Sequence, residues 1–181
     1  MADILKVVQL RASRIAALAA LVLAAPAPAA LASSGSHAPS AQQIRAAVRS
    51  AAQSRLLWAT VNICNTTRHR DTIGIRGQAP SLPFATTISM RIQVDYWNGS
   101  KFVPDRYATK RVNIGDPVNE VVQNGANFTF HPPEILSGTI EFEWKLGGRV
   151  IGRATRLTGH GYKHVAGGDP SGYSTATCRI S

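Results

Sequence analysis

The sequence predicts an all-β domain built from antiparallel strands. Between residues 87 and 96, large apolar side chains alternate strictly with polar ones, as in a strand with one buried and one wet face. Residues 139–146 repeat this alternation, and the pairs Asn98-Gly99 and Gly147-Gly148 that follow the two segments favour hairpin turns. No helical pattern interrupts these segments, which favours a β-sandwich over an α/β fold.

Residues 1–32 have the three parts of a secretory signal peptide. Basic side chains near the N-terminus precede an apolar run over 15–25, and Ala30-Leu31-Ala32 offers a cleavage site of the small-x-small type. The apolar run is shorter than the roughly 20 residues that span a bilayer, so a retained membrane anchor is the less favoured alternative. We predict cleavage after Ala32 and no transmembrane segment. The protein should be secreted, and either extracellular or associated with the cell surface.

Residues 33–55 are predicted to form a linker followed by a short helix. Small residues and prolines up to Ser40 suit a flexible spacer, and Ser40 and Gln43 have the spacing of a capping box. Apolar side chains then recur at helical spacing on one face: Ile44, Ala47, Val48 and Ala51. We expect this face to pack against the domain or the helix to fray in solvent; the less favoured alternative is a helix that lies on an anionic surface.

Residues 56–181 are predicted to form the β-sandwich domain. Its expected strands cover 57–64, 72–76, 87–96, 101–103, 128–130, 139–146, 150–157 and 173–180. We expect a loop over 77–85, which contains two prolines, and a turn at Asn124-Gly125. Pro132-Pro133 should end the strand before it, because proline cannot donate to a strand ladder.

Two registers are open to the hairpin at Gly147-Gly148. A two-residue loop would pair Phe142 with Arg153 and place a charge beside the core face. A three-residue loop pairs Leu146 with Val150 and sets Glu143 across from Arg153 on the wet face, where opposite charges attract. We therefore predict the three-residue loop.

Cys64 and Cys178 lie in the first and the last expected strand. An exported protein meets an oxidising compartment, where a lone pair of cysteines is typical of a disulfide rather than of a redox or metal site. We therefore predict one disulfide between Cys64 and Cys178 that ties the first strand to the last and closes the domain.

Two segments carry a resemblance to known domains. Residues 140–156, with Trp144 facing inward before a glycine hairpin, resemble the central tryptophan strand of immunoglobulin-like domains, and residues 172–178 resemble the strand with their second cysteine. Residues 57–64, 73–77 and 172–178 also resemble a group of exported actinobacterial proteins of unknown function. This resemblance implies a single immunoglobulin-like antiparallel β-sandwich, preceded by the signal peptide and the short helix, and it brings no activity.

The charge of the chain bears on its partners. The residues from Ser33 onward carry 17 basic and nine acidic side chains, a net charge of +8. A positive field favours anionic partners, but the basic residues are scattered, and only Lys110 and Arg111 are adjacent. We predict weak association with anionic surfaces and no nucleic-acid partner. The expected partner is an unknown protein or a cell-surface polymer.

Candidate catalytic and metal-binding residues are few. Glu141 and Glu143 project from one strand face about 7 Å apart, a spacing that could serve glycoside hydrolysis. His160 and His164, with Asp169 beyond them, could bind a metal if they lay on a helix. Alternating glutamates are ordinary on a wet strand, however, and the glycines around the histidines oppose a helix. We therefore predict no catalytic, cofactor-binding or metal-binding residues.

Two tryptophans have different expected roles. Trp144 lies on the inward phase of its strand and should belong to the core. Trp97 lies beside a hairpin tip and should be partly exposed, where it could stack on a sugar, anchor a partner, or pack against Phe102 or Arg91.

The sequence thus predicts a secreted, non-catalytic binding or surface-associated module. Recognition should lie in loops, chiefly residues 77–86, 104–119 and 158–172. The alternative is a small extracellular hydrolase that lacks a recognisable motif.

Overall fold

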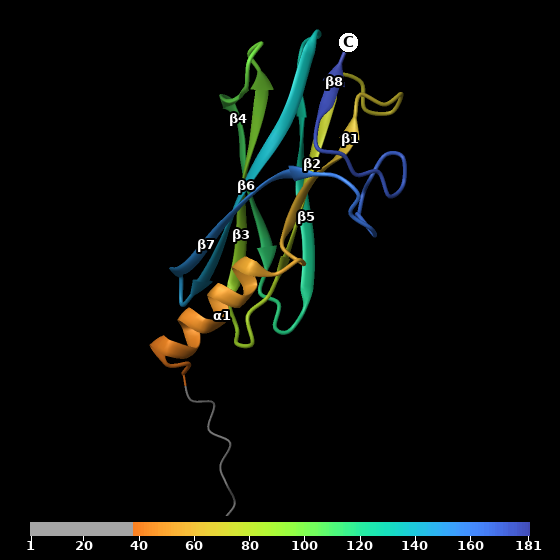
Figure 1. Ribbon diagram of the computed structural model, residues 1–181. Coiled ribbons are helices and arrows are strands. Elements are labelled where there is room, and N and C mark those ends of the chain that lie inside the picture. The colour runs from red at the N-terminus through yellow and green to blue at the C-terminus, as the bar shows by residue number, and fades with distance from the viewer. Residues whose placement is uncertain (1–37) are drawn as a thin grey trace, which may run out of the picture. The chain divides into compact units, whose positions relative to one another are not determined.

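The computed structural model describes residues 38–181 as a β-rich domain with one short helix (Figure 1). The predicted signal peptide and the first residues of the linker lie outside the described residues. The elements are α1 (Ala41–Gln53), β1 (Trp58–Cys64), β2 (Thr72–Pro80), β3 (Thr87–Trp97), β4 (Phe102–Gly115), β5 (Val121–Thr129), β6 (Glu134–Leu146), β7 (Arg149–Gly159) and β8 (Cys178–Ile180). The prediction of an all-β domain is confirmed.

Helix α1 begins with the predicted capping box. The Ser40 hydroxyl accepts a bond from the backbone N–H of Gln43, and the Gln43 side chain accepts one from the N–H of Ser40. The apolar face of the helix packs on the domain: Ala51 is buried, and Val48 lies over Gly152 of β7, where a Cβ atom would overlap it. Of the two favoured alternatives, packing against the domain is therefore the one that the structure shows.

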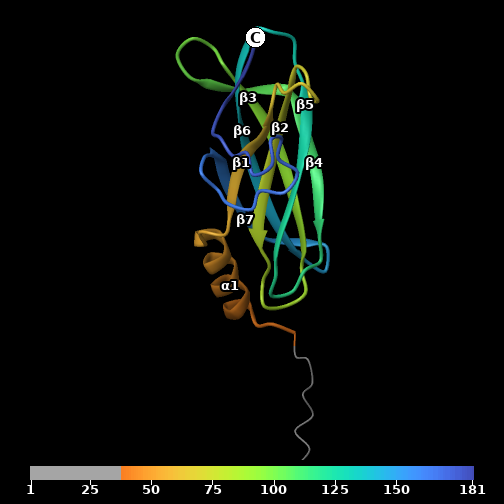
Figure 2. The same ribbon diagram turned by 90° about the vertical axis from the view of Figure 1, so that its right-hand side faces the viewer.

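The strands follow one continuous path in the order β4-β3-β6-β7-β1-β2-β5, with β8 beside β6. All pairs are antiparallel except β1 and β7, which run parallel where Ala59 and Thr60 meet Thr158 and Gly159. The path curls, so that its two edge strands, β4 and β5, run side by side and the sheet is nearly closed, like a barrel (Figure 2).

Side chains bridge the seam between β4 and β5. The Lys110 ammonium donates to the Asn127 carbonyl oxygen at 2.6 Å and lies 4.9 Å from the centroid of the Phe128 ring. The Asn124 amide donates to the Asn113 carbonyl oxygen at 2.9 Å. The two edges are therefore held by individual side-chain bonds, since the described residues form no backbone ladder between these strands.

The core lies between the β3-β6 side of the sheet and the β1-β2 side. Trp144 and Phe142 are its largest fully buried side chains, and the Trp144 ring N–H donates to the Pro80 carbonyl oxygen at 3.1 Å. Gly77 makes room for this packing, because a Cβ atom there would come within 2.9 Å of Met90 and Phe142. The prediction that Trp144 belongs to the core is confirmed.

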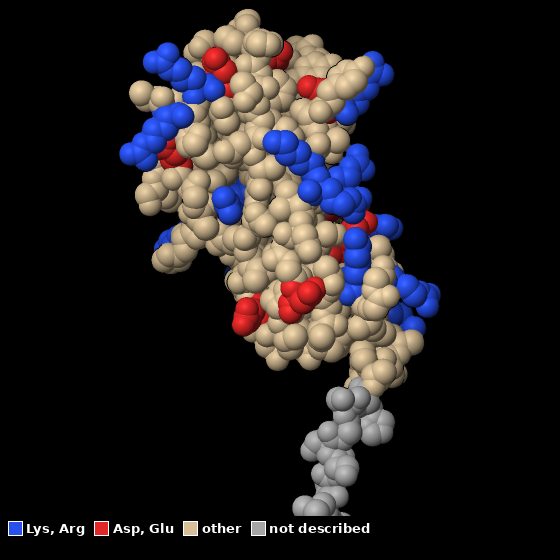
Figure 3. Space-filling view, turned by 180° about the vertical axis from the view of Figure 1, so that it is seen from behind, with Lys and Arg blue, Asp and Glu red and all other residues tan. Residues whose placement is uncertain are grey.

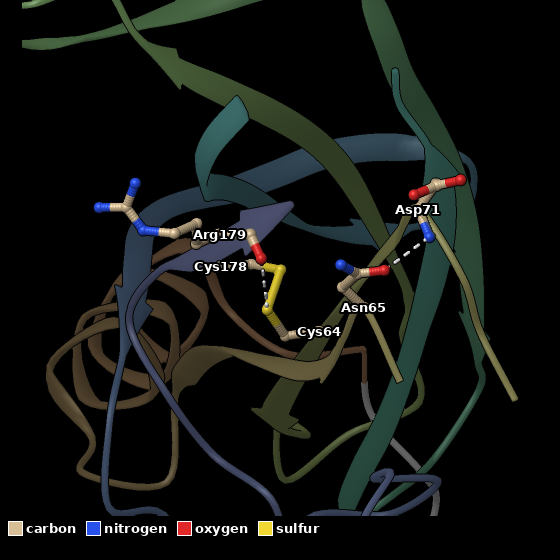
Figure 4. Close-up of a disulfide and its surroundings, with 5 residues drawn as sticks. All are labelled: Cys64, Asn65, Asp71, Cys178 and Arg179. Carbon is tan, nitrogen blue, oxygen red and sulfur yellow. Dashed lines mark hydrogen bonds between the residues drawn. A yellow bond between two sulfur atoms is a disulfide. The ribbon is translucent and has the colours of Figure 1, made fainter. Parts of the chain in front are cut away.

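The predicted disulfide between Cys64 and Cys178 is confirmed, with the two Cα atoms 5.3 Å apart (Figure 4). It joins β1 to β8, the first strand to the last. Strand β7 leaves β6 near Leu157 and pairs with β1, and β8 takes the freed place on β6 through Leu136 and Cys178. The disulfide therefore connects β1, which gains β7 as a neighbour, to β8, which replaces β7 beside β6.

The hairpin at Gly147-Gly148 combines the two registers. Glu143 pairs with Arg153 as predicted, but Leu146 pairs with Arg149, so the loop has two residues and the predicted pairing of Leu146 with Val150 is wrong. A β-bulge after Trp144 absorbs the difference. The bulge lets the hairpin keep a tight glycine turn and still place Glu143 opposite a positive charge.

Three other local predictions are wrong. Strand β2 continues to Pro80 through part of the expected 77–85 loop, because β5 pairs with it along its whole length. Asn124-Gly125 lies inside β5 rather than at a turn, and a Cβ atom at Gly125 would overlap the Ile75 carbonyl oxygen. Of the last expected strand, 173–180, only β8 forms.

The position of Trp144 relative to the disulfide differs from the immunoglobulin arrangement, in which the tryptophan packs against the bond. Cys178 pairs with Leu136, eight residues before Trp144 on β6. That separation is about 26 Å at the rise of a strand. The tryptophan and the disulfide therefore secure opposite ends of this domain.

Candidate functional site

A large bulge in β4 marks the candidate site. Gln93 of β3 pairs with Thr109 and Asp95 pairs with Pro104, so residues 105–108 stand opposite Val94 alone. The Gln93 side-chain amide holds the bulge: it donates to the carbonyl oxygens of Asp105, at 2.5 Å, and Ala108, at 3.3 Å. Bulges of this kind redirect side chains and are common beside functional sites.

The bulge projects Tyr107 into solvent. Its side chain is 82% exposed, the highest value among the large apolar and aromatic residues of the described domain. The Tyr107 backbone N–H donates to an Asp105 carboxylate oxygen at 2.9 Å, and the Arg106 guanidinium lies 4.9 Å from the centroid of the Tyr107 ring. The ring is therefore oriented by the bulge, and apart from the Arg106 contact it is left largely in solvent.

A groove of about 510 Å³ lies beside the bulge, along the part of the seam between β4 and β5 that is lined by Lys110 and Asn127. Its walls combine aromatic, hydroxyl, amide and charged groups: Asp105, Tyr107, Ala108, Lys110, Asn127, Phe128, Thr129, Phe130, His131 and Glu134. The volume lies within the range of about 300–1,000 Å³ that is typical of ligand sites. We call this feature, with the bulge, the seam groove.

A second hollow, of about 240 Å³, adjoins the seam groove, and Glu134 lines both. Trp97 lines the second hollow and is 40% exposed, with the Phe102 ring at 5.3 Å in an edge-to-face contact. The prediction that Trp97 is partly exposed is confirmed, and of the alternatives for its ring the structure shows the packing against Phe102. Trp97 and Tyr107 thus border neighbouring hollows on the β3-β4 hairpin.

The outer face of β3 and β6 carries a smaller hollow, of about 190 Å³, with two carboxylates in its lining. Asp95 is buried there and accepts a bond from the Thr139 hydroxyl at 2.7 Å. Burial raises the pKa of Asp95, and the Thr139 hydrogen bond partly offsets this effect. Glu141 and Arg91 also line this hollow, whose volume lies below the usual range of ligand sites.

Glu143 is the centre of a cluster of positive charges. It was expected on a wet face, but it is 3% exposed, because Arg111 and Arg153 cover it and bind it at 2.8 and 3.0 Å. Burial alone would raise its pKa. The hydrogen bonds from Arg153 and Arg111, with the charges of Arg111 and Lys145, lower the pKa to about 2. At neutral pH Glu143 therefore stays ionised and cannot donate a proton.

The histidines and Asp169 do not form a metal site. His160 and His164 lie in an irregular segment rather than on a helix, and both are exposed. The Asp169 carboxylate accepts a bond from the Thr66 hydroxyl at 2.5 Å. Within residues 38–181, no group of three potential ligands is placed to bind a metal ion.

The expected recognition loop 158–172 begins with the last two residues of β7, Thr158 and Gly159, and its remaining part packs on the outer face of β1 and β2. The Tyr162 ring stacks on Trp58 with the ring centroids 4.8 Å apart, and the Asn62 amide donates to the Gly167 carbonyl oxygen at 2.7 Å. Arg76 lies beneath Gly167, and burial lowers its pKa. Much of this segment is therefore a cover for β1 and β2.

The other two expected recognition loops are also partly wrong. The 77–86 segment begins inside β2, and most of 104–119 belongs to β4. Sequence reasoning missed the β4 bulge, although Pro104 and the loss of alternation over 105–107 were signals for an irregular edge strand.

Positive charge is dispersed over the surface. Figure 3 shows Lys and Arg side chains over much of one face, with acidic side chains among them. Two more hollows exceed 500 Å³: one lies between α1 and Phe84, and one lies beside the β1-β2 loop at Arg68. Neither has an aromatic ring as exposed as Tyr107, which distinguishes the seam groove.

No family model matches the chain, and no curated protein sequence resembles it significantly. Helix α1 is too short and too polar to cross a membrane, and it is the only helix within residues 38–181.

Proposed function

We propose that this protein is an exported, non-catalytic binding or surface-associated module that recognises its partner through the seam groove. One observation carries the proposal: the four-residue bulge of β4 holds Tyr107 in solvent beside a groove of ligand size. An exposed ring costs hydration free energy, and exposed aromatic residues often form the centre of binding sites. The disulfide supports an oxidising destination.

The state of the carboxylates supports the non-catalytic part of the proposal. Glu143 is ionised and bound by two guanidinium groups, so it is unsuited to paired acid–base work with Glu141. Asp95 has a raised pKa, but the Thr139 hydroxyl engages it in a hollow of only about 190 Å³. A small extracellular hydrolase remains the alternative, and Asp95 would be its acid.

We further propose that the domain is a modified immunoglobulin-like sandwich related to exported actinobacterial proteins. The order of Cys64, Trp144 and Cys178, and the packing of Trp144 in an all-β core, support this assignment. The parallel contact of β1 with β7, the near closure of the sheet and the separation of Trp144 from the disulfide would be its modifications.

Export makes a prediction about the mature N-terminus. If residues 1–32 are a signal peptide, the intact mass of the protein recovered from culture medium or from the cell surface should correspond to a chain that begins at or near Ser33. Mass spectrometry of the protein from its native host measures this directly. A full-length chain that stays in the membrane fraction would contradict cleavage and favour the retained anchor.

The seam groove can be tested by filling it. Thr129 lines the groove and is exposed, so Thr129→Arg should obstruct the groove without disturbing the core. We expect this variant to lose most of the saturable binding of the mature protein to the surface of its native host cells. Thr155→Arg is the matched control, because Thr155 is an exposed strand residue that lines the small outer-face hollow. Equal loss in both variants, or loss in the control alone, would contradict the proposal.

Weak electrostatic association makes a separate prediction. If the dispersed positive charge attracts anionic surfaces, binding to phosphatidylserine vesicles should fall steeply between about 0.05 and 0.5 M salt, because exposed charges are then screened within a few ångströms. Co-sedimentation at the two salt concentrations measures the bound fraction. Binding that does not change with salt would contradict an electrostatic attachment.

A further inference from the structure

We propose that the ligand of the seam groove is a neutral glycan chain of the cell surface, with Tyr107 as the platform on which a sugar ring stacks. This inference rests on the proposed function, because it names the ligand class of the same site. Three features of the groove carry it: its exposed rings, its balanced polar groups and the irregular edge of β4.

Two exposed aromatic rings border the seam groove and the neighbouring hollow. Tyr107 is 82% exposed, and its phenol combines an apolar face with a polar tip. The C–H face of a sugar can cover such a ring while the hydroxyl groups of the sugar stay available for hydrogen bonds. Trp97, which borders the neighbouring hollow, offers a second exposed ring. Because Glu134 lines both hollows, a chain of sugars could pass from one to the other.

The polar groups suit hydroxyl groups rather than a strong charge. Asp105 and Glu134 are acceptors, the Thr129 hydroxyl both donates and accepts, and Lys110 is the cation of the groove wall. Lys110 is already engaged by the Asn127 carbonyl oxygen and the Phe128 ring. Arg106, the other cation beside the groove, belongs to the bulge, does not line the groove and lies over the Tyr107 ring. With two carboxylates and one engaged ammonium, the lining does not offer the cluster of free cations that phosphate or sulfate groups require.

The irregular edge of β4 disfavours an extended peptide as the ligand of the seam groove. An extended peptide would bind here by adding a strand to β4 or β5, which requires a regular row of free backbone groups. The bulge over 105–108 interrupts that row on β4, and bulges protect edge strands from such pairing. Further along the seam, the Lys110 and Asn124 bonds already occupy edge carbonyl oxygens. A glycan needs no strand ladder.

The test uses the mature protein and two probes from the same host cells. One probe is the intact cell envelope, and the other is the neutral polysaccharide of that envelope, freed of protein by protease digestion and of lipid by solvent extraction. We expect saturable binding to both. In NMR spectra of the labelled protein, the purified polysaccharide should shift the amide signals of residues 105–108.

Variants of Tyr107 separate stacking from general surface effects. Tyr107→Ala should weaken binding to the polysaccharide at least about tenfold, as expected for a central aromatic contact. Tyr107→Phe keeps the ring and should stay within about threefold of wild type. Leu157→Ala is the matched control, because Leu157 is 72% exposed on β7 and does not line the groove. We expect this control to bind like wild type.

The outcomes distinguish this inference from the proposed function. Binding to intact envelopes that protease abolishes, together with no binding to the polysaccharide, would overturn the glycan proposal and leave a binding module with a protein partner. Equal binding of Tyr107→Ala and wild type to the polysaccharide would overturn the role of the ring. Failure to bind either probe would overturn the proposed function as well.

Discussion

Cys64→Ala should lower the free energy of unfolding by several kcal/mol, and Cys178→Ala should have the same effect. The disulfide spans 114 positions of the chain, so it removes much conformational freedom from the unfolded state. The chain-entropy model gives about 4.7 kcal/mol for a loop of about 100 residues. This is a large share of the roughly 5–15 kcal/mol that holds a typical domain folded.

The position of the bond adds a structural reason for a large effect. Cys178 belongs to a strand of three residues that pairs with the first three residues of β6, and Cys64 is the last residue of β1. Without the bond, so short a strand would be held by three residue pairs alone, and we expect β8 to detach first. Hydrogen exchange of the β8 amides that bond to β6 should show this loss of protection.

Comparison of the single and double cysteine variants tests whether the effect comes from the disulfide itself. The double variant should be no less stable than either single variant, because each substitution already removes the whole bond. Denaturant titration of the four proteins measures the differences. Two free thiols in the native protein, or single variants as stable as wild type, would contradict the stabilising role.

Glu143→Gln should make the protein less stable at neutral pH and remove much of its sensitivity to acid. The pKa of Glu143 is about 2 in the folded protein, against an ordinary value of 4.5. Because the folded pKa is depressed, the stabilisation is fully present above about pH 4.5 and is lost as the pH falls toward 2. The difference corresponds to at most about 3 kcal/mol.

The matched control is Glu141→Gln, which changes the neighbouring glutamate on the same face of β6. The Glu141 side chain is 37% exposed and lies 3.9 Å from Arg153, so its loss should cost less than about 1 kcal/mol. Urea titrations at pH 7 and pH 3 measure both variants. If wild type and Glu143→Gln lose the same stability between these two pH values, the cluster does not hold the charge of Glu143 as described.

Local sequence patterns were sufficient to predict several features of this protein. Strict alternation over 87–96 predicted β3, the capping box at Ser40 predicted the start of α1, and two cysteines behind a predicted export signal indicated their bond. Each of these signals arises from neighbouring residues or from the chemistry of one residue type. They could therefore be predicted without knowing which strands are adjacent.

Other features depend on contacts between residues that are distant in the chain, and local patterns predicted these incorrectly. Asn124-Gly125 has the local pattern of a turn, but pairing with β2 makes it part of a strand. The glycine is needed there because a Cβ atom would overlap the Ile75 carbonyl oxygen. Glu143 has the pattern of a wet residue, and Arg111, 32 positions away, covers it.

The candidate site is the clearest case of this division. The sequence indicated an exposed ring at Trp97 and a recognition segment over 104–119, but it did not indicate Tyr107 as the most exposed ring. The bulge exists because Gln93 and Asp95 fix two pairings on β3 that leave four residues of β4 between them. The groove exists because β4 and β5, which lie next to each other along the chain, become the opposite edges of one curled sheet. Pairing register and sheet closure are properties of the assembled sheet, and no local pattern specifies them.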